Sequence, residues 1–222
     1  MSKAETLRQL HLAPPLLVLP NAWDVASADA LHGTIYIANF QTTGEPGYHG
    51  SVSVCTLAQG CGRRLRSSLV RGRFLGIAVD GSNNVYVSGQ TGFRGHKQSG
   101  MIALFRNGQE PAVAVPGYTS AFPAGLDFDK AGNLVAFDSG WRSISVLTGC
   151  PDNCIVHGRF ALQSLTAAYF AKITPDGKQL QVGNVNSSTV DVYAYYGVRG
   201  IKYLYSYVGQ GAVVGSLAMT AQ

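Results

Sequence analysis

The chain has 222 residues, of which only 13% are charged, while 27 are glycine and 11 are tyrosine. This balance is typical of many short strands joined by turns, and it excludes a disordered chain or a charge-rich helical bundle. The net charge of +5 favours the approach of an acidic partner without specifying one. No apolar run reaches about eighteen residues, so no membrane-spanning helix is predicted.

The first 30 residues differ in pattern from the rest of the chain. A short apolar run up to Leu19 is followed by a Pro-Asn turn and an Ala-rich stretch that predicts the first turns of a helix, ending at Ala30. From Gly33 the residues alternate like a half-buried strand. The sequence therefore predicts a short α/β-like segment over 1–30 and an all-β domain over 31–222.

The all-β part contains four copies of a unit made of short apolar strands and a turn rich in Asp, Gly and Asn. Alignment of the hairpin turns places Gly33, Asn84, Asn133 and Lys178 in register, separated by 51, 49 and 45 residues. The first copy, "GTIYIANF", lacks an obvious first strand. This spacing is typical of propeller blades.

The turn chemistry and the strand patterns support a β-propeller. In "VDGSNNVYV", Asp bonds nearby backbone groups and Gly or Asn adopts positive φ, so that two strands reverse tightly. Alternation then places Val85 and Val87 on one face of the sheet and Tyr86 on the other. Both faces are apolar, so neighbouring blades must cover both.

The repeat "AGLDFDKAGNLVAFDSG" resembles the blades of the NHL-repeat and SMP-30/gluconolactonase-like six-bladed propellers, over about residues 33–222. The resemblance implies an open arc or incomplete ring with four recognisable blades. An alternative is a four-bladed ring, closed by Ser216–Gln222 pairing with Thr34–Asn39. The expected blades are approximately 31–74, 75–123, 124–166 and 167–215, with a partial strand at 216–222.

The string "LPNAWD" followed by "SA" is similar to the start of the isocitrate lyase/phosphoenolpyruvate mutase family, and it contains Asn21, Trp23 and Asp24. The resemblance implies a fragment of a metal-dependent (β/α)₈ barrel. The metal-binding and catalytic segments of that family have no counterpart here, so no catalytic residue is carried over. We therefore expect a foreign N-terminal segment on a truncated or rearranged propeller, with "PLLVLPNAW" as the replacement inner strand of the first blade.

The four cysteines form two close pairs, each just after a third-strand pattern: Cys55 with Cys61, and Cys150 with Cys154. Disulfides are the favoured interpretation, with free thiols and a zinc site as alternatives. Disulfides imply an extracytoplasmic location for the ancestor of the propeller. No signal peptide is recognisable, which predicts a cytoplasmic location for the chain as it stands.

A basic cluster predicts either an anion-binding rim or a solvated edge strand, where positive charge discourages strand pairing. The edge-strand alternative is favoured because no aromatic residues interleave with the basic ones. The cluster consists of Arg63, Arg64, Arg66, Arg71 and Arg73, joined by Arg94, His96 and Lys97.

Tyrosines form a stripe near the C-terminus. Tyr203, Tyr205 and Tyr207 are expected to alternate on one strand face, opposite Tyr193 and Tyr195 on the preceding strand. The stripe predicts either packing against a neighbouring blade, which is the commoner use, or a sugar-binding surface.

The resemblance to gluconolactonases implies a divalent cation in the central channel that polarises a lactone carbonyl. An Asn ligand often precedes an inner strand in that family, but Ala124 occupies the matching position here. The remaining candidate oxygens belong to Asp127, Asp138, Asn184 and Asn186. The five histidines have no spacing typical of metal ligands.

The sequence therefore favours a non-catalytic propeller that acts as a binding or scaffold domain for an unknown protein or glycan, without a cofactor. A metal-dependent lactonase-like hydrolase with an incomplete site is the alternative. Nucleic acid is not indicated as a partner, and self-association through unpaired blade edges is expected.

Overall fold

The computed structural model consists almost entirely of strands. It describes residues 25–31, 33–39, 50–56, 58–70, 72–91, 99–163, 168–184 and 187–208, with side chains for all of these except 25–31 and 168–170. No helix among the described residues has the length and apolar character needed to cross a membrane.

Among the described residues, sixteen strands form four antiparallel sheets of four strands each, and we call these sheets blades 1 to 4. Blade 1 contains β1 (Val25–Leu31), β2 (Thr34–Asn39), β3 (Ser51–Thr56) and β4 (Gly60–Leu65). Blade 2 contains β5 (Phe74–Val79), β6 (Val85–Gln90), β7 (Gly100–Phe105), the 3₁₀ turn η1 (Arg106–Gly108) and β8 (Val113–Ala114). Blade 3 contains β9 (Pro123–Phe128), β10 (Leu134–Asp138), β11 (Ser143–Thr148) and β12 (Ile155–Ala161). Blade 4 contains β13 (Ala168–Ile173), β14 (Gln179–Asn184), β15 (Thr189–Tyr195), the 3₁₀ turn η2 (Gly197–Arg199) and β16 (Ile201–Val208).

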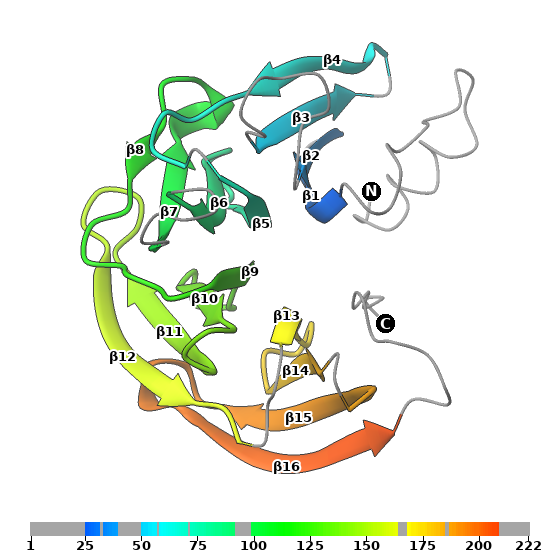
Figure 1. The fold of residues 1–222 in the computed structure, drawn as a ribbon, viewed down its shortest axis with the longest axis vertical. Coiled ribbons are helices and arrows are strands. Elements are labelled where there is room, and N and C mark those ends of the chain that lie inside the picture. Colours follow the sequence, from blue (N-terminus) through cyan, green and yellow to red (C-terminus); the bar gives the residue numbers. More distant parts are fainter. Residues whose placement is uncertain are drawn as a thin grey trace.

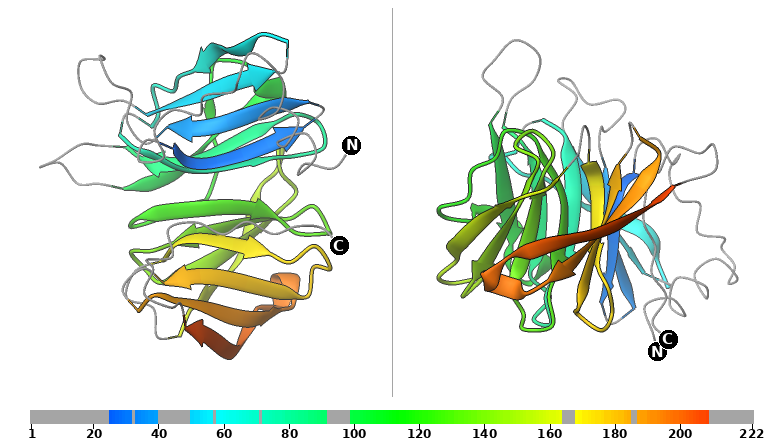
Figure 2. Two further views of the ribbon diagram at one scale, coloured as in Figure 1. Left: turned by 90° about the vertical axis from the view of Figure 1, so that its right-hand side faces the viewer. Right: turned by 90° about the horizontal axis from the view of Figure 1, so that it is seen from below.

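The blades are arranged as an arc around a centre (Figure 1). Strands β1, β5, β9 and β13 lie innermost, and β4, β8, β12 and β16 lie at the rim. The arc of described strands opens between blade 1 and blade 4, and Figure 2 shows the sheets stacked face to face along it. The predicted fold, an incomplete β-propeller with four blades, is confirmed.

The hydrophobic core consists of three clusters, one in each space between neighbouring blades. Val85 and Val87 pack toward blade 1, whereas Tyr86 on the same strand packs toward blade 3. Tyr86 meets Phe128 edge-on, with ring centroids 5.3 Å apart. The predicted alternation is therefore correct, and blades 2 and 3 bury both of their faces against their neighbours.

Two of the hairpins between first and second strands are held by aspartates, the buried Asp129 and the half-buried Asp80. The Oδ1 atom of Asp129 accepts hydrogen bonds from the backbone N–H groups of Ala131 (2.9 Å) and Asn133 (2.8 Å). Its Oδ2 atom accepts bonds from the side-chain amide of Asn133 (2.8 Å) and the hydroxyl of Tyr195 in blade 4 (2.9 Å). Asp80 repeats the turn in blade 2 with Ser82 and Asn84. The turn thus orders its own backbone and, at Asp129, also joins two blades.

Close packing of the inner strands explains one glycine of the repeat. A Cβ atom at Gly76 of β5 would collide with the carbonyl oxygen of Ala124 and with Gly125 in β9. The hydroxyl of Ser88 also donates a hydrogen bond to the carbonyl oxygen of Ala124. Inner strands of adjacent blades therefore approach each other at backbone distance.

Two expectations for the first blade are wrong. Val25–Leu31 forms the inner strand β1, paired with β2 from Val25↔Asn39 to Leu31↔Thr34, and not a helix. Pairing along a complete strand outweighs the helix propensity of an Ala-rich stretch. Because β1 fills the inner position, the predicted replacement strand "PLLVLPNAW" is not needed there. That string lies outside the described residues, as do Asn21, Trp23 and Asp24. The domain boundary at residue 30 stays a prediction, and β1 (Val25–Leu31) extends across it.

The alternative of a four-bladed ring is also wrong in its proposed pairing. Strand β2 (Thr34–Asn39) hydrogen-bonds to β1 on one side and to β3 on the other. Neither edge of β2 is left for Ser216–Gln222, which lie outside the described residues. The described strands accordingly form an open arc.

Replacing Asp129 with Ala should lower the free energy of unfolding by about 2–3 kcal/mol, because several buried donors lose a charged acceptor. Asp176, in the equivalent turn of blade 4, provides the matched control. It is fully exposed, and its bond from the Thr174 hydroxyl holds its pKa below the usual value. Asp176→Ala should leave the stability nearly unchanged in urea unfolding. Equal losses in both variants would contradict the assigned role of Asp129.

Candidate functional site

Basic residues in β4 and directly after it connect blade 1 to blade 2. The Arg63 guanidinium donates to Oε1 of Gln109 (2.9 Å), and the backbone N–H of Arg66 donates to Oε1 of Glu110 (2.5 Å). Arg64 is exposed on the same strand, which is the outermost strand of its blade. Arg63, Arg64 and Arg66 thus lie along a blade rim, and Arg63 and Arg66 contribute contacts between blades. Arg73 is half-buried, and Arg71, Arg94, His96 and Lys97 lie outside the described residues.

The candidate metal ligands do not converge on one point. Asp138 and Asn184 end β10 and β14, at the edge of the blades where inner strands begin, since Asp138 pairs with Pro123 and Asn184 with Ala168. Asp127 pairs with Val135, toward the opposite end of β9. Within the described part of the chain, no three Asp, Glu, His or Cys side chains gather as metal ligands do. Asn186 lies outside that part.

Hydrogen bonds within the fold already occupy the two aspartates. The buried Asp138 carboxylate accepts bonds from the backbone N–H groups of Ala121 (2.9 Å), Phe122 (3.2 Å) and Trp141 (2.9 Å). Asp127 accepts bonds from the N–H of Ile173 (2.9 Å) and, at 3.4 Å, from Lys172 on β13. Both side chains therefore fasten loops or strands. Asn184 is 2% exposed and also has an interaction partner.

The predicted stripe of three tyrosines is wrong, because a bulge interrupts β16. Tyr203 is opposite Tyr193, but Tyr205 is opposite Val192, with the irregularity between these pairs. A one-residue slip moves the following side chains to the other face. Tyr203 consequently packs edge-on against Tyr193 toward blade 3, with ring centroids 5.6 Å apart.

Tyr205 and Tyr207 lie on the opposite side of blade 4, which we call its open face. They share this face with Val190 and Val192, their partners in β15. Val192 is buried, whereas Tyr205 is 41% and Tyr207 is 56% exposed. The two rings meet edge-on at 5.1 Å, and their hydroxyls are 3.2 Å apart, a contact that raises the pKa of Tyr205.

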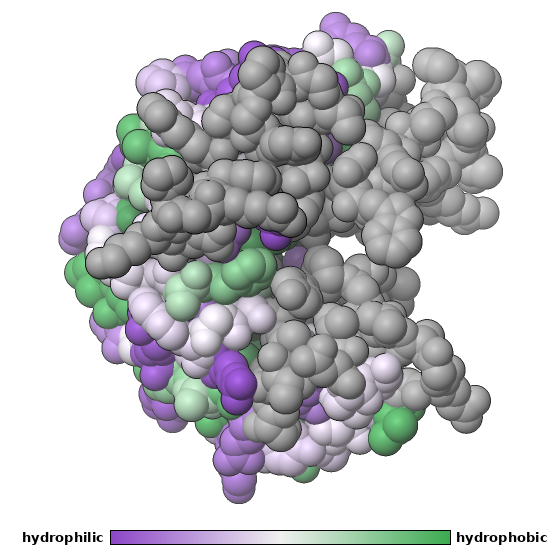
Figure 3. All heavy atoms as spheres, in the orientation of Figure 1, coloured by the Kyte–Doolittle hydropathy of each residue, from purple (hydrophilic) through white to green (hydrophobic). Residues whose placement is uncertain are grey.

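Exposed hydrophobic side chains concentrate in this part of the chain. Six of the nine large hydrophobic residues that are exposed among the described ones fall between positions 196 and 208. Hydrophobic atoms are visible at the end of β16 in Figure 3. The six are Tyr196, Val198, Leu204, Tyr205, Tyr207 and Val208. Such a concentration is typical of an interaction surface.

Both predicted disulfides are present. Cys55 is bonded to Cys61, and Cys150 is bonded to Cys154. The second bond closes the loop between β11 and β12, and Cys154 packs with Tyr86 in the core between blades 2 and 3.

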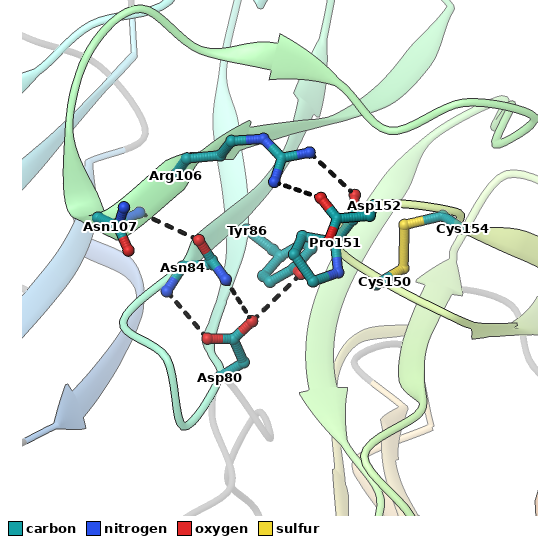
Figure 4. A network of polar contacts seen from close by, with 9 residues as sticks. All are labelled: Asp80, Asn84, Tyr86, Arg106, Asn107, Cys150, Pro151, Asp152 and Cys154. Atoms are coloured by element: carbon teal, nitrogen blue, oxygen red, sulfur yellow. Dashed lines mark hydrogen bonds and ion pairs between the residues drawn. A yellow bond between two sulfur atoms is a disulfide. The ribbon is translucent and has the colours of Figure 1, made fainter.

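The Cys150–Cys154 loop also meets η1 of blade 2 (Figure 4). Arg106 donates to Oδ1 of Asp152 (2.7 Å), and Asn107 donates its backbone N–H to Oδ1 of Asn84 (3.0 Å). Asn84 and the Tyr86 hydroxyl both donate to Oδ2 of Asp80, at 2.9 and 3.3 Å. Burial, and secondarily Asp80, raise the pKa of Tyr86, so its hydroxyl stays a donor at neutral pH.

An aromatic–cationic pair was missed by the analysis of the sequence. The Arg159 guanidinium of β12 lies 3.7 Å from the ring centroid of Trp141, which is 43% exposed in the loop between β10 and β11. Eighteen positions separate the two residues, and no spacing rule connects a loop to a later outer strand. The available signal was the tryptophan itself, placed directly after the turn "DSG".

Comparisons with solved structures agree with the propeller fold. The chain is similar to a putative 6-phosphogluconolactonase from Bacteroides uniformis, at 11% identity and a TM-score of 0.60, over 86% of this chain and 58% of that one. It is similar to the periplasmic gluconolactonase of Pseudomonas aeruginosa, at 13% identity and a TM-score of 0.62, over 84% and 58%. It is also similar to a chain of a nidogen–laminin complex, at 15% identity and a TM-score of 0.55, over 81% and 64%.

These similarities establish the architecture, because identities of this size carry the fold alone. The chain spans less than two thirds of the length of each of these proteins. Searches against protein-family models and against curated proteins give no match, so the resemblance of residues 1–30 to the lyase/mutase family gains no support.

Removing the Cys150–Cys154 disulfide, as Cys150→Ser with Cys154→Ser, should lower the free energy of unfolding by about 2 kcal/mol, as expected for a small closed loop. The matched variant without Cys55 and Cys61 should lose a similar amount. Urea unfolding with and without reductant measures both effects. A midpoint that does not respond to reductant would contradict the presence of these bonds.

Proposed function

We propose that this chain is a non-catalytic binding domain, and that β16 binds an extended segment of an acidic protein partner. The observation that carries the proposal is the concentration of exposed hydrophobic side chains between residues 196 and 208. The open face of blade 4 contributes Tyr205 and Tyr207 to this surface.

The position of β16 favours an extended partner. Among the described strands, β16 pairs only with β15, so its other edge presents backbone N–H and C=O groups. An added strand would satisfy these groups, while its alternate side chains contact Tyr205 and Tyr207. Edge strands of this length generally require either protection or a partner.

Charge favours an acidic partner over a second copy of the chain. Arg199 and Lys202 are exposed beside the hydrophobic surface, and the whole chain carries a net charge of +5. Two such surfaces would repel each other, whereas carboxylates on a partner would be attracted.

The contacts of the candidate ligands support binding in preference to catalysis. The Asp138 carboxylate accepts hydrogen bonds from three backbone N–H groups, and the Asp127 carboxylate accepts one from the backbone N–H of Ile173 in β13. The two disulfides support an oxidising compartment outside the cytoplasm.

A labelled peptide in which valine alternates with glutamate should bind with saturable fluorescence anisotropy, and at least about tenfold more tightly than a peptide that alternates valine with lysine. The double variant Tyr205→Ser with Tyr207→Ser should weaken binding about tenfold or more, because aromatic anchors dominate such contacts. Ile155→Ser is the control, since Ile155 is 50% exposed on β12, another rim strand. It should bind like the unmodified chain.

Absence of binding by both peptides would contradict the proposal. Light scattering on the free protein tests whether the same surface binds a second copy of the chain. If the protein is a dimer and the tyrosine double variant is a monomer, the partner is a second copy and not an acidic protein.

A lactonase activity is the second candidate, and the similarity to two gluconolactonase structures favours it. The prediction from the present geometry is that hydrolysis of gluconolactone stays at the uncatalysed rate with or without added Ca²⁺, Zn²⁺ or Mn²⁺. A metal-dependent rate that Asp127→Asn abolishes, while the fold is retained by circular dichroism, would establish the lactonase instead.

A further inference from the structure

The Trp141–Arg159 pair lies at the junction of blades 2 and 3, on a different blade from β16. Arg159 pairs with Ser145, whose side chain faces blade 2, and its guanidinium reaches the segment before β9 by donating to the carbonyl oxygen of Thr119 (3.1 Å). One face of the Trp141 ring lies against the guanidinium. Trp141 is 43% exposed, so part of this residue remains accessible to solvent.

The loop that carries Trp141 is held in place by hydrogen bonds to its backbone. The buried Asp138 carboxylate accepts the backbone N–H of Trp141 and also those of Ala121 and Phe122. The loop that carries Trp141 is thereby fixed to the segment that Arg159 contacts. Arg142, the next residue, is exposed and adopts φ of 51°, an uncommon conformation for a residue with a Cβ atom. A ring fixed in this way loses little conformational entropy when it binds a ligand.

Three buried hydroxyl groups belong to the segments that carry or contact the Trp141–Arg159 pair. The hydroxyls of Tyr118 and Ser120 adjoin each other, whereas the Ser143 hydroxyl has no hydrogen-bond partner among the described residues. Burial chiefly raises the pKa of Tyr118, the contact with the Ser120 hydroxyl lowers it, and Asp138 raises it. Ser143 lies opposite Asp138 across β10 and β11.

We propose that Trp141, Arg142 and Arg159 form a binding site for an acidic saccharide, of which a uronic-acid unit is the simplest example. The apolar face of a pyranose ring fits the exposed part of an indole, in the manner of other aromatic contacts at recognition sites. The two arginines have no ion-pair partner among the described residues, and guanidinium groups bind carboxylates in bidentate fashion. A neutral sugar would stack on the Trp141 indole but would leave the two arginine charges without a partner.

The same side chains fit a nucleotide, because a base stacks on tryptophan and a phosphate binds arginine. The disulfides favour the saccharide, since they place the chain in an oxidising compartment, where acidic glycans occur. We therefore make the nucleotide an outcome of the test.

The chain contains two tryptophans, so Trp23→Phe leaves Trp141 as the sole indole reporter. Titration of this variant with an oligogalacturonate trimer should give a saturable change in tryptophan fluorescence, and the affinity should fall as salt is added. A neutral galactose trimer should bind at least about tenfold more weakly. Calorimetry on the otherwise unmodified chain should detect the same binding and should lose it in Trp141→Ala.

Two arginine variants separate recognition from folding. Arg142→Gln removes a charge that makes no side-chain hydrogen bond or ion pair within the described residues, and it should weaken binding about tenfold without changing the melting temperature. Arg64→Gln, an exposed arginine on β4, is the matched control and should bind like the unmodified chain. Equal affinity for the acidic and neutral trimers, tighter binding of adenosine monophosphate than of the acidic trimer, or unchanged binding in Trp141→Ala would overturn the proposal.

Discussion

Face-to-face packing of the sheets is the constraint on which the rest of this structure depends. Within the single strand β6, Val85 and Val87 point into one core and Tyr86 points into the next, so a blade inside the arc depends on both of its neighbours. The cores contain few polar atoms, and burial of an apolar side chain contributes about 1.5–3 kcal/mol. Packing also restricts the residue type at single positions, because inner strands that approach as closely as β5 and β9 admit only glycine at position 76.

The blades at the ends of such an arc differ from those inside it. Blades 2 and 3 have a described neighbour on each side, whereas blades 1 and 4 have one. The open face of blade 4 changes from the buried Val192 to the exposed Tyr205 and Tyr207 toward the rim. The bulge in β16 produces this arrangement, because it turns the last two tyrosines away from the core that holds Tyr203. Exposed aromatic side chains thus follow from a one-residue change of register at the end of the repeat.

Local rules predicted much of this fold from the sequence. The Asp of each D-x-x-x-N turn, the positive φ two residues before the second strand (Asn83 and Gly132) and the paired cysteines all act within about six residues, so the sequence displays them directly. The inner strand β1 was not predicted, since an alanine-rich stretch carries a helical preference that only long-range pairing with β2 overrides. The bulge at β16 and the contact of Arg159 with Trp141 depend on register and on loop placement, for which one sequence contains no signal.

The contacts of the buried polar residues show which groups in this molecule remain for function. Each second strand ends in a buried polar residue, namely Asn39, Gln90, Asp138 and Asn184. Asn39 donates to Ser51 and Ser53 of its own blade, and Asp138 accepts from two loops, so these positions join blade to blade or strand to strand. These side chains are therefore engaged in holding the arc together. The recognition that we propose uses groups outside these contacts, namely the exposed aromatic rings with basic neighbours at the rim of blade 4 and at the junction of blades 2 and 3.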